Sequence, residues 1–170
     1  MKSKFTLIRA KRSLIFLKRY FILAAVVICI RGSVYVLSHW YDIRYQYTDS
    51  IPGKIYLIVK NKIPQKGDLV AFWPPPSNIY KHTCFIKYVK GIAGEFIKRE
   101  GLRFYLNSEF IGEAKKYSLK GLPLFPSEGG VILKDHYFVW TPHKDSYDSR
   151  YKDIGTISSA NIIGTAYRLL

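Results

Sequence analysis

The strongest hydrophobic feature of the chain lies near its N-terminus, where residues 20–30 form an unbroken apolar run. As a helix, this run would span roughly 17 Å, less than the ~30 Å hydrocarbon core of a bilayer. Extension to Leu37 gives roughly 27 Å, but it places Arg31 inside the apolar layer, at about 2.5–3.5 kcal/mol unless the guanidinium reaches the interface. A second frame begins at Leu14 and lets the side chains of Lys18 and Arg19 reach the cytoplasmic side of the membrane. The pattern predicts a membrane-spanning helix and leaves both frames open.

Beyond residue 40 no long helical period remains, and short apolar strands alternate with polar turns. Tyr, Phe, Ile and Val, which suit a pleated sheet, are abundant in these strands. Asn107 and Ser108 separate two of them and predict a hairpin. The expected strands cover residues 55–59, 69–73, 85–89, 103–106, 110–111, 131–133, 137–140 and 162–167. Residues 112–130 and the polar segment 141–153 are expected to be irregular. The fold class expected from this pattern is all-β, an antiparallel sheet system that folds over on itself.

Charge changes the interpretation of the N-terminal run. The net charge is +15, but residues 1–31 hold eight Lys and Arg and no acid, so the remainder carries 19 basic and 12 acidic groups, or +7. Half of the positive charge therefore belongs to the N-terminus, which weakens a nucleic-acid function and favours membrane orientation with the basic end in the cytoplasm. We expect a basic cytoplasmic segment at 1–19, a transmembrane anchor at 20–38 and an extracytoplasmic β domain at 39–170.

Two other interpretations of the apolar run are less favourable. A cleaved signal peptide needs small residues around a cleavage site after the run, and residues 31–34, RGSV, do not offer a good one. A buried core helix would not need seven flanking positive charges. The two cysteines cannot pair if Cys29 lies in the bilayer, so Cys84 is expected to be free. The four histidines show no metal-binding spacing, and neither a metal nor a cofactor is expected.

The candidate chemistry begins with Ser50, at a turn marked by proline and glycine in the stretch TDSIPGKIY, residues 48–56. A serine in such a place is usually a plain turn residue. To act as a nucleophile it needs a base, and a lysine can serve only when desolvation keeps its amine neutral. Strand alternation puts Lys87 and Lys90 on opposite faces, so only one of them can enter a dry site. Alternation alone does not decide which.

Three segments, in chain order, resemble the serine–lysine signal peptidases, and among them most closely the TraF-type conjugative-transfer peptidases. They are the Ser50 stretch, the strand FIKYV that holds Lys87, and SYDSR at residues 146–150. A fourth element, residues 66–72, is similar to the family's strand after a Gly-Asp turn. The resemblance covers residues 47–168 and implies a signal-peptidase-like β fold, with Ser50 as nucleophile and Lys87 as general base.

The same resemblance implies the supporting residues. Ser146 would hydrogen-bond the lysine amine, and Asp148 and Arg150 would form a structural ion pair. Thr48, two residues before the nucleophile, would help to hold the oxyanion together with the main-chain N–H of Ser50. The chain departs from the family pattern in its turns: AGE replaces Pro-Gly-Asp at residues 93–95, TPH replaces Gly-Asp-Asn at 141–143, and the glycine after the serine is one position early. These changes concern loop geometry more than the dyad.

The resemblance implies a membrane-anchored serine endopeptidase that processes an exported pilin-type precursor for conjugative transfer or type IV secretion. It also implies a single-pass protein of the bacterial inner membrane with its catalytic domain on the periplasmic side. TraF-type enzymes join pilin ends into a ring, and the sequence does not distinguish cyclisation from hydrolysis. Two alternatives remain: a general type I signal peptidase that cleaves many exported proteins, and a membrane scaffold protein without catalytic activity.

Overall fold

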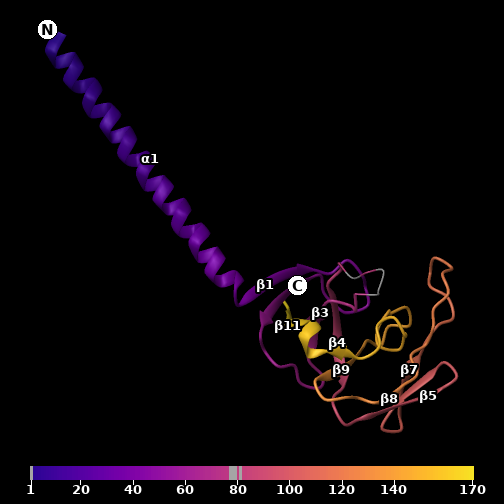
Figure 1. Cartoon of the computed structure of the whole chain (residues 1–170). Helices are drawn as coiled ribbons and strands as arrows, with labels where there is room; N and C mark the ends of the chain where they lie inside the picture. Colours follow the sequence, from indigo (N-terminus) through magenta and orange to yellow (C-terminus); the bar gives the residue numbers. More distant parts are fainter. Residues whose placement is uncertain (1, 77–79, 81) are drawn as a thin grey trace. The chain divides into compact units, whose positions relative to one another are not determined.

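The computed structural model describes residues 2–76, 80 and 82–170, with side chains from residue 16 onward. The chain divides into two compact units, one up to Trp40 and one from Tyr41 to Leu170. The first contains a single helix, α1 (Lys2–Ser38), and the second contains all of the strands (Figure 1). This architecture confirms the predicted fold class, a mostly antiparallel β domain preceded by one apolar helix.

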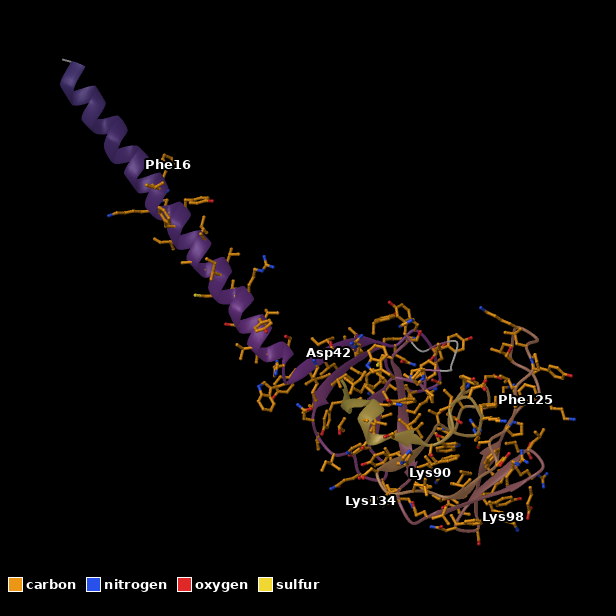
Figure 2. The ribbon with its side chains drawn as sticks, in the orientation of Figure 1. Phe16, Asp42, Lys90, Lys98, Phe125 and Lys134 are labelled. Atoms are coloured by element: carbon orange, nitrogen blue, oxygen red, sulfur yellow. The ribbon has the colours of Figure 1, made fainter. Side chains whose placement is uncertain are left out.

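The apolar part of α1 runs from Phe16, labelled in Figure 2, to Ser38, and its length and composition suit a membrane span. At 23 residues it would be roughly 34 Å long, enough for the hydrocarbon core of a bilayer. It begins four residues before the expected start at residue 20, closer to the frame that starts at Leu14 than to the shorter one. Its side chains, Arg31 among them, are almost all exposed within this unit.

The larger sheet has seven strands in the order β1-β2-β11-β3-β4-β9-β10, and every neighbouring pair is antiparallel. Its strands are β1 (Tyr41–Tyr45), β2 (Ile55–Lys60), β3 (Leu69–Phe72), β4 (Phe85–Gly91), β9 (His136–Trp140), β10 (Ile157–Ser158) and β11 (Ile162–Arg168). A single turn of 3-10 helix, Ser159–Asn161, precedes β11. The last strand in sequence thus lies inside the sheet, between β2 and β3.

The smaller sheet has four antiparallel strands in the order β7-β6-β5-β8. They are β5 (Phe96–Glu100), β6 (Arg103–Leu106), β7 (Glu109–Glu113) and β8 (Gly130–Val131). Asn107 and Ser108 have φ angles of 47° and 78°, the left-handed conformation that a two-residue hairpin requires, so the expected hairpin is confirmed. Buried side chains of this sheet pack with Phe138 of β9 and with Tyr151, which joins the small sheet to the large one.

Alternation of burial explains why these segments form strands. In β2, Tyr56 and Ile58 are fully buried, while the residues between them are partly exposed. They pack against Ala71 of β3, Ile86 of β4 and Ala166 of β11 in one core cluster. On the other face of the sheet a second cluster contains Val70, Phe72, Val89, Val139, Ile154 and Ile157. The sheet therefore has a packed layer on each side, and these layers hold β2 and β4 in place.

Three expectations about strands need correction. The predicted strand 131–133 overlaps β8 only at Val131, although the buried Ile132 still exchanges main-chain hydrogen bonds with Glu95 and Gly94, both at 2.9 Å. The strand β5 was not expected, since in Phe96–Glu100 only Ile97 is buried and the rest resembles a solvated turn. Tyr41–Tyr45 was not among the expected strands either, yet it pairs with β2 as the edge strand β1.

Candidate active site

Ser50 lies in the connection between β1 and β2, on a turn that is fixed from beneath. Ile51, the next residue, is 3% exposed and packs in the core under β2. The hydroxyl of the fully buried Tyr56 donates a hydrogen bond to the carbonyl of Pro52. Gly53 has φ = +94°, and a Cβ there would lie 2.6 Å from a carbonyl oxygen of the C-terminal segment. The turn therefore presents the half-buried Ser50 on a rigid support.

The side chain of Lys87, on β4, extends toward this turn. Its Nζ donates to Ser50 Oγ at 2.9 Å and to Ser146 Oγ at 3.0 Å, and the residue is only 5% exposed. Lys90 points to the opposite face, where its Nζ lies 3.1 Å from a carboxylate oxygen of Glu109. The structure thus brings Lys87, and not Lys90, to the serine, a choice that strand alternation had left open.

Burial changes the acidity of Lys87. Removal from water disfavours the ammonium form and lowers the pKa of Lys87 from 10.5 to about 8. The Asp148 carboxylate opposes this effect, while the Arg150 guanidinium adds to it. With a pKa near 8, roughly one amine in ten is neutral at pH 7, compared with fewer than one in a thousand for an exposed lysine. The amine can therefore accept a proton from the serine hydroxyl that it contacts.

Thr48 lies beside the serine, and its hydroxyl oxygen is 3.1 Å from Ser50 Oγ. The side-chain amide of Gln46 donates to the same threonine oxygen at 2.6 Å, and Gln46 is 8% exposed. Sequence analysis named Thr48 through the family resemblance and missed Gln46. The only indication in the sequence is spacing, since residues 46, 48 and 50 are all polar and lie two positions apart.

Asp148 and Arg150 form a bidentate ion pair buried in the loop after β9. Arg150 Nη2 lies 2.8 Å and Nε 2.9 Å from the two carboxylate oxygens, and the side chains are 3% and 0% exposed. Arg150 Nη1 also donates to the Glu113 carbonyl at 3.0 Å. Gly112 makes room for this contact, because a Cβ there would lie 3.0 Å from Nη1. The remaining Nη2 contacts are with the carbonyl oxygens of Thr141, His143 and Ser146, at 3.4–3.5 Å.

The expected polar loop 141–153 is irregular, but much of it is buried rather than solvated. The Ser149 hydroxyl accepts from the Val139 N–H at 2.8 Å, and the Ser149 N–H donates to the Val139 carbonyl at 3.0 Å. Val139 pairs with Val89 of β4, the strand that holds Lys87. The loop is thus attached to β9 next to β4, and this attachment sets Ser146 against the lysine amine.

Neither a metal nor a reactive thiol enters the site. Within the described part of the chain, no three His, Cys, Asp or Glu side chains lie where they could hold a metal ion. Cys84, just before β4, is partly buried and unpaired with Cys29. Burial raises the pKa of the Cys84 thiol to about 11, so it is a protonated, weakly nucleophilic group. The chemistry available here is that of a serine hydroxyl beside a buried amine.

The chain is similar to known proteins in sequence and, more distantly, in structure. Residues 13–170 match the family model described as signal peptidase, peptidase S26. A curated relative from Sinorhizobium fredii (strain NBRC 101917 / NGR234), named "Probable conjugal transfer protein TraF", is 29% identical over 147 residues, which cover 75% of this chain and 76% of the relative. Among solved structures, a signal peptidase I from Enterococcus faecalis V583 is similar with a TM-score of 0.40 and 24% identity, over 61% of this chain and 97% of that one.

The family match extends over nearly the whole chain, including the segments that hold Ser50, Lys87 and Ser146. The curated relative confirms the TraF-type resemblance seen in the sequence. The chain belongs to the signal peptidase family, peptidase S26, and within it resembles the TraF-type members.

Proposed function

We propose that the protein is a membrane-anchored serine endopeptidase with Ser50 as nucleophile and Lys87 as general base. The observation that carries this proposal is the 2.9 Å contact between Lys87 Nζ and Ser50 Oγ, made by an amine that is 5% exposed. A buried amine with a lowered pKa is what a lysine needs to act as a base near neutral pH.

In the acylation step, neutral Lys87 takes the proton of the Ser50 hydroxyl as Oγ attacks the carbonyl carbon of the scissile peptide bond. The negative charge that develops on the carbonyl oxygen is held by the Thr48 hydroxyl and the main-chain N–H of Ser50. The Lys87 ammonium then gives its proton to the leaving amine, so the C–N bond breaks and an ester on Ser50 remains.

In the deacylation step, Lys87, neutral again, takes a proton from water as the water oxygen attacks the ester carbonyl. Ser50 regains its proton from Lys87, and a carboxylic acid product leaves. If the N-terminal amine of a substrate attacks in place of water, the product is a new peptide bond, and the two ends of a pilin-type precursor are joined. Both outcomes use the same side chains.

Ser146, Asp148 and Arg150 have supporting roles in this proposal. Ser146 holds the amine of Lys87 through a second contact, at 3.0 Å. The Asp148–Arg150 pair fixes the loop that carries Ser146, and as a closely joined pair it adds little net charge beside the amine. Burial therefore remains the main cause of the lowered pKa of Lys87.

The proposed substrate is an exported pilin-type precursor, cleaved during conjugative transfer or type IV secretion. The support is the relative named as a probable conjugal transfer protein and the family's description as signal peptidases. The helix of Phe16–Ser38, with its basic N-terminal flank, would anchor the enzyme in the inner membrane with the β domain on the periplasmic side. Exported precursors emerge on that side.

Mass spectrometry of a candidate pilin precursor, co-produced with the full-length protein, tests the proposal. Wild type should give a shortened product, and Ser50→Ala and Lys87→Ala should each leave the precursor intact, with a double variant no worse than either single one. Lys90→Ala is the matched control, because Lys90 lies on the same strand and faces away from the serine.

The alternative functions predict different products in this experiment. Cleavage of unrelated exported precursors at equal rates would indicate a general signal peptidase, and an unprocessed precursor in the presence of wild type would indicate a scaffold protein. A product lighter by one water than the linear fragment would indicate cyclisation. Full activity of Lys87→Ala would refute the dyad.

A further inference from the structure

Gln46 lies at the entrance to the turn that carries the nucleophile, and its position is fixed. Its main-chain N–H donates to the Lys54 carbonyl at 2.7 Å, across the base of the turn. Its side chain is nearly buried, and its amide Nε2 donates to Thr48 Oγ1 at 2.6 Å. Thr48 Oγ1 in turn lies 3.1 Å from Ser50 Oγ. An amide, a threonine hydroxyl and the serine hydroxyl thus form a short chain of hydrogen bonds.

The direction of this chain follows from the number of protons available. A hydroxyl has one proton to donate and two lone pairs that accept. Because the Gln46 amide donates to Thr48, it occupies a lone pair of the threonine oxygen and leaves the threonine proton for another acceptor. Either hydroxyl could donate across the 3.1 Å between Thr48 Oγ1 and Ser50 Oγ, and the threonine is the donor when the serine proton is directed to a neutral Lys87.

We infer that Gln46 is a positioning residue that orients the Thr48 hydroxyl as a donor toward the reacting centre. This inference rests on the proposed function and extends it by one residue. When Lys87 is neutral, the serine proton is directed to its amine and the threonine proton is directed to Ser50 Oγ. As Oγ bonds to the substrate carbon, the same threonine proton becomes available to the developing oxyanion. No proton leaves Gln46 or Thr48 at any stage, so the chain acts by orientation alone.

Two substitutions separate donor direction from simple packing. Gln46→Met keeps the approximate volume and removes the donor, so the Thr48 hydroxyl is free to rotate. Gln46→Glu keeps the shape and, once ionised, only accepts hydrogen bonds, so it turns the threonine proton away from the serine. We expect kcat to fall about 10-fold in the first variant and about 10²-fold in the second, comparable with loss of one oxyanion donor. KM for a precursor-derived peptide should change less than about twofold in both.

The decisive measurement combines these variants with Thr48→Val in the full-length enzyme. If Gln46 acts through Thr48, then Gln46→Glu should cost nothing further in the Thr48→Val background. A purely structural role for Gln46 would reduce activity by the same factor in both backgrounds, and this result, or full activity of both single variants, would overturn the inference. Gln65→Met and Gln65→Glu, on the exposed turn before β3, are the matched controls.

The failure of this inference can be told apart from the failure of the proposed function. If Ser50→Ala still cleaves the peptide, the proposed function is wrong whatever Gln46 does. If Ser50→Ala is inactive and the Gln46 variants behave as wild type, only the role of Gln46 is wrong. Thermal melting of each variant identifies a loss caused by unfolding, and the comparison then rests on whichever Gln46 variant keeps the wild-type melting temperature.

A second inference rests on a different part of the molecule, the segment that leaves the small sheet after β7. Figure 1 shows it as an orange loop that extends away from β7 before the chain returns to β8. Tyr117 pairs with Pro123 in an isolated β-bridge, so the segment is a narrow hairpin. Large apolar side chains at its tip and base are exposed: Tyr117 62%, Leu119 85%, Leu122 52% and Phe125, labelled in Figure 2, 62%.

The main chain at the tip of this hairpin satisfies its own hydrogen bonds. The Ser118 N–H donates to the Leu122 carbonyl at 2.8 Å, and the Gly121 N–H donates to the Ser118 carbonyl at 2.9 Å. The Ser118 hydroxyl accepts from the N–H groups of Lys120 and Leu122, at 3.3 and 3.1 Å. A tip closed in this way can move from water into a less polar environment while few of its main-chain polar groups lack a hydrogen-bond partner.

The hairpin segment itself is basic: residues 114–127 contain Lys115, Lys116 and Lys120 but neither Asp nor Glu, and the acids Glu128 and Asp153 lie beside Phe125 at its base. Lys115 forms an ion pair with Asp145, and Lys116 and Lys120 are exposed. We propose that this hairpin inserts its tip into the interface of an anionic lipid bilayer. Leucine, tyrosine and phenylalanine side chains would enter the headgroup region, while the lysine stems reach back to the phosphates.

Fluorescence labelling of the full-length protein in vesicles tests this proposal. In a Cys29→Ser, Cys84→Ser background, an environment-sensitive dye is attached at Leu119→Cys, and at Ser108→Cys on the β6–β7 turn as a control. In vesicles with phosphatidylglycerol, the dye at position 119 should be quenched several-fold more by lipid-borne quenchers than the dye at 108. Lys116→Glu with Lys120→Glu should remove most of this difference.

Equal exposure of both dyes to aqueous iodide, in anionic and in zwitterionic vesicles, would overturn the lipid proposal. Protection of position 119 that develops only after a precursor peptide is added would overturn it as well, in favour of a protein-binding role for the hairpin.

Discussion

Replacement of Ser146 by alanine, followed by the pH dependence of cleavage, examines the proposed mechanism most directly. Ser146 Oγ accepts a hydrogen bond from Lys87 Nζ at 3.0 Å, and Ser50 Oγ accepts the other at 2.9 Å. Loss of the Ser146 hydroxyl removes an acceptor that stabilises the ammonium form, and it leaves the amine held from one side only. The variant should therefore have a lower kcat/KM, and the pKa of its Lys87 should be lower than in wild type.

The magnitudes follow from the burial of Lys87. Its pKa of about 8, against an ordinary 10.5, corresponds to about 3 kcal/mol of disfavoured charge. kcat/KM of wild type should therefore rise with pH through one deprotonation with a midpoint near 8. A hydrogen bond to a charged group contributes about 1.5 kcal/mol, so Ser146→Ala should move the midpoint downward by about one pH unit or less.

The assay measures kcat/KM for a precursor-derived peptide between pH 5 and 10, for wild type and Ser146→Ala. A histidine base would give a midpoint near 6.5 that ignores Ser146 and disappears on replacement of that histidine. This outcome would refute the serine–lysine mechanism. An unchanged midpoint near 8 in Ser146→Ala would instead limit the error to the role of Ser146.

Four further predictions follow from the same structure. Thr48→Val should lower kcat about 10²-fold with little effect on KM, and unchanged kcat would mean that main-chain donors alone hold the oxyanion. Lys87→Met should raise the free energy of unfolding at pH 7 by about 1–3 kcal/mol, measured in urea. The pKa of Lys87 is lower in the folded state than in the unfolded state, so the wild-type protein gains stability as the pH rises from about 8 to 10.5. The difference between the two proteins should therefore shrink over this pH range. Asp148→Asn should destabilise the fold by about 3–5 kcal/mol, since Arg150 is left as an unpaired buried charge, and an unchanged melting temperature would contradict this. Protease added to spheroplasts should digest residues beyond about 40 and spare a tag at the N-terminus, with the reverse pattern contradicting the proposed orientation.

The sequence was sufficient for the strands with strong alternation and for the hairpin at Asn107 and Ser108, because local pattern and turn chemistry agree there. It was insufficient where burial comes from distant parts of the chain. In β5 only Ile97 is buried, and one of the two strands that flank it, β8, lies about thirty residues further on, while the other, β6, follows directly. Ile132 is buried in the core of the small sheet, and the sequence around it does not distinguish it from a strand residue.

The site shows the same division. The resemblance named Ser50, Lys87 and Ser146, and the structure brings both serine hydroxyls within 3.0 Å of the lysine amine. Alternation could not choose between Lys87 and Lys90, because both have apolar neighbours, and the choice depends on which face of β4 packs under the loop after β9. Gln46 was missed because a single glutamine before a turn is usually exposed to solvent, and the sequence does not show that its amide donates to Thr48.

The place of β11 in the large sheet has a consequence for the timing of activity. The hairpin β1–β2, which carries Ser50 in its turn, and the pair β3–β4, which carries Lys87, have no direct ladder between them; β11 joins them by pairing with β2 on one side and β3 on the other. A chain still being synthesised therefore has its serine and its lysine on separate pieces of sheet. The proposed dyad can form only after the last strand has inserted, so the proposed nucleophile would stay inactive in a growing chain.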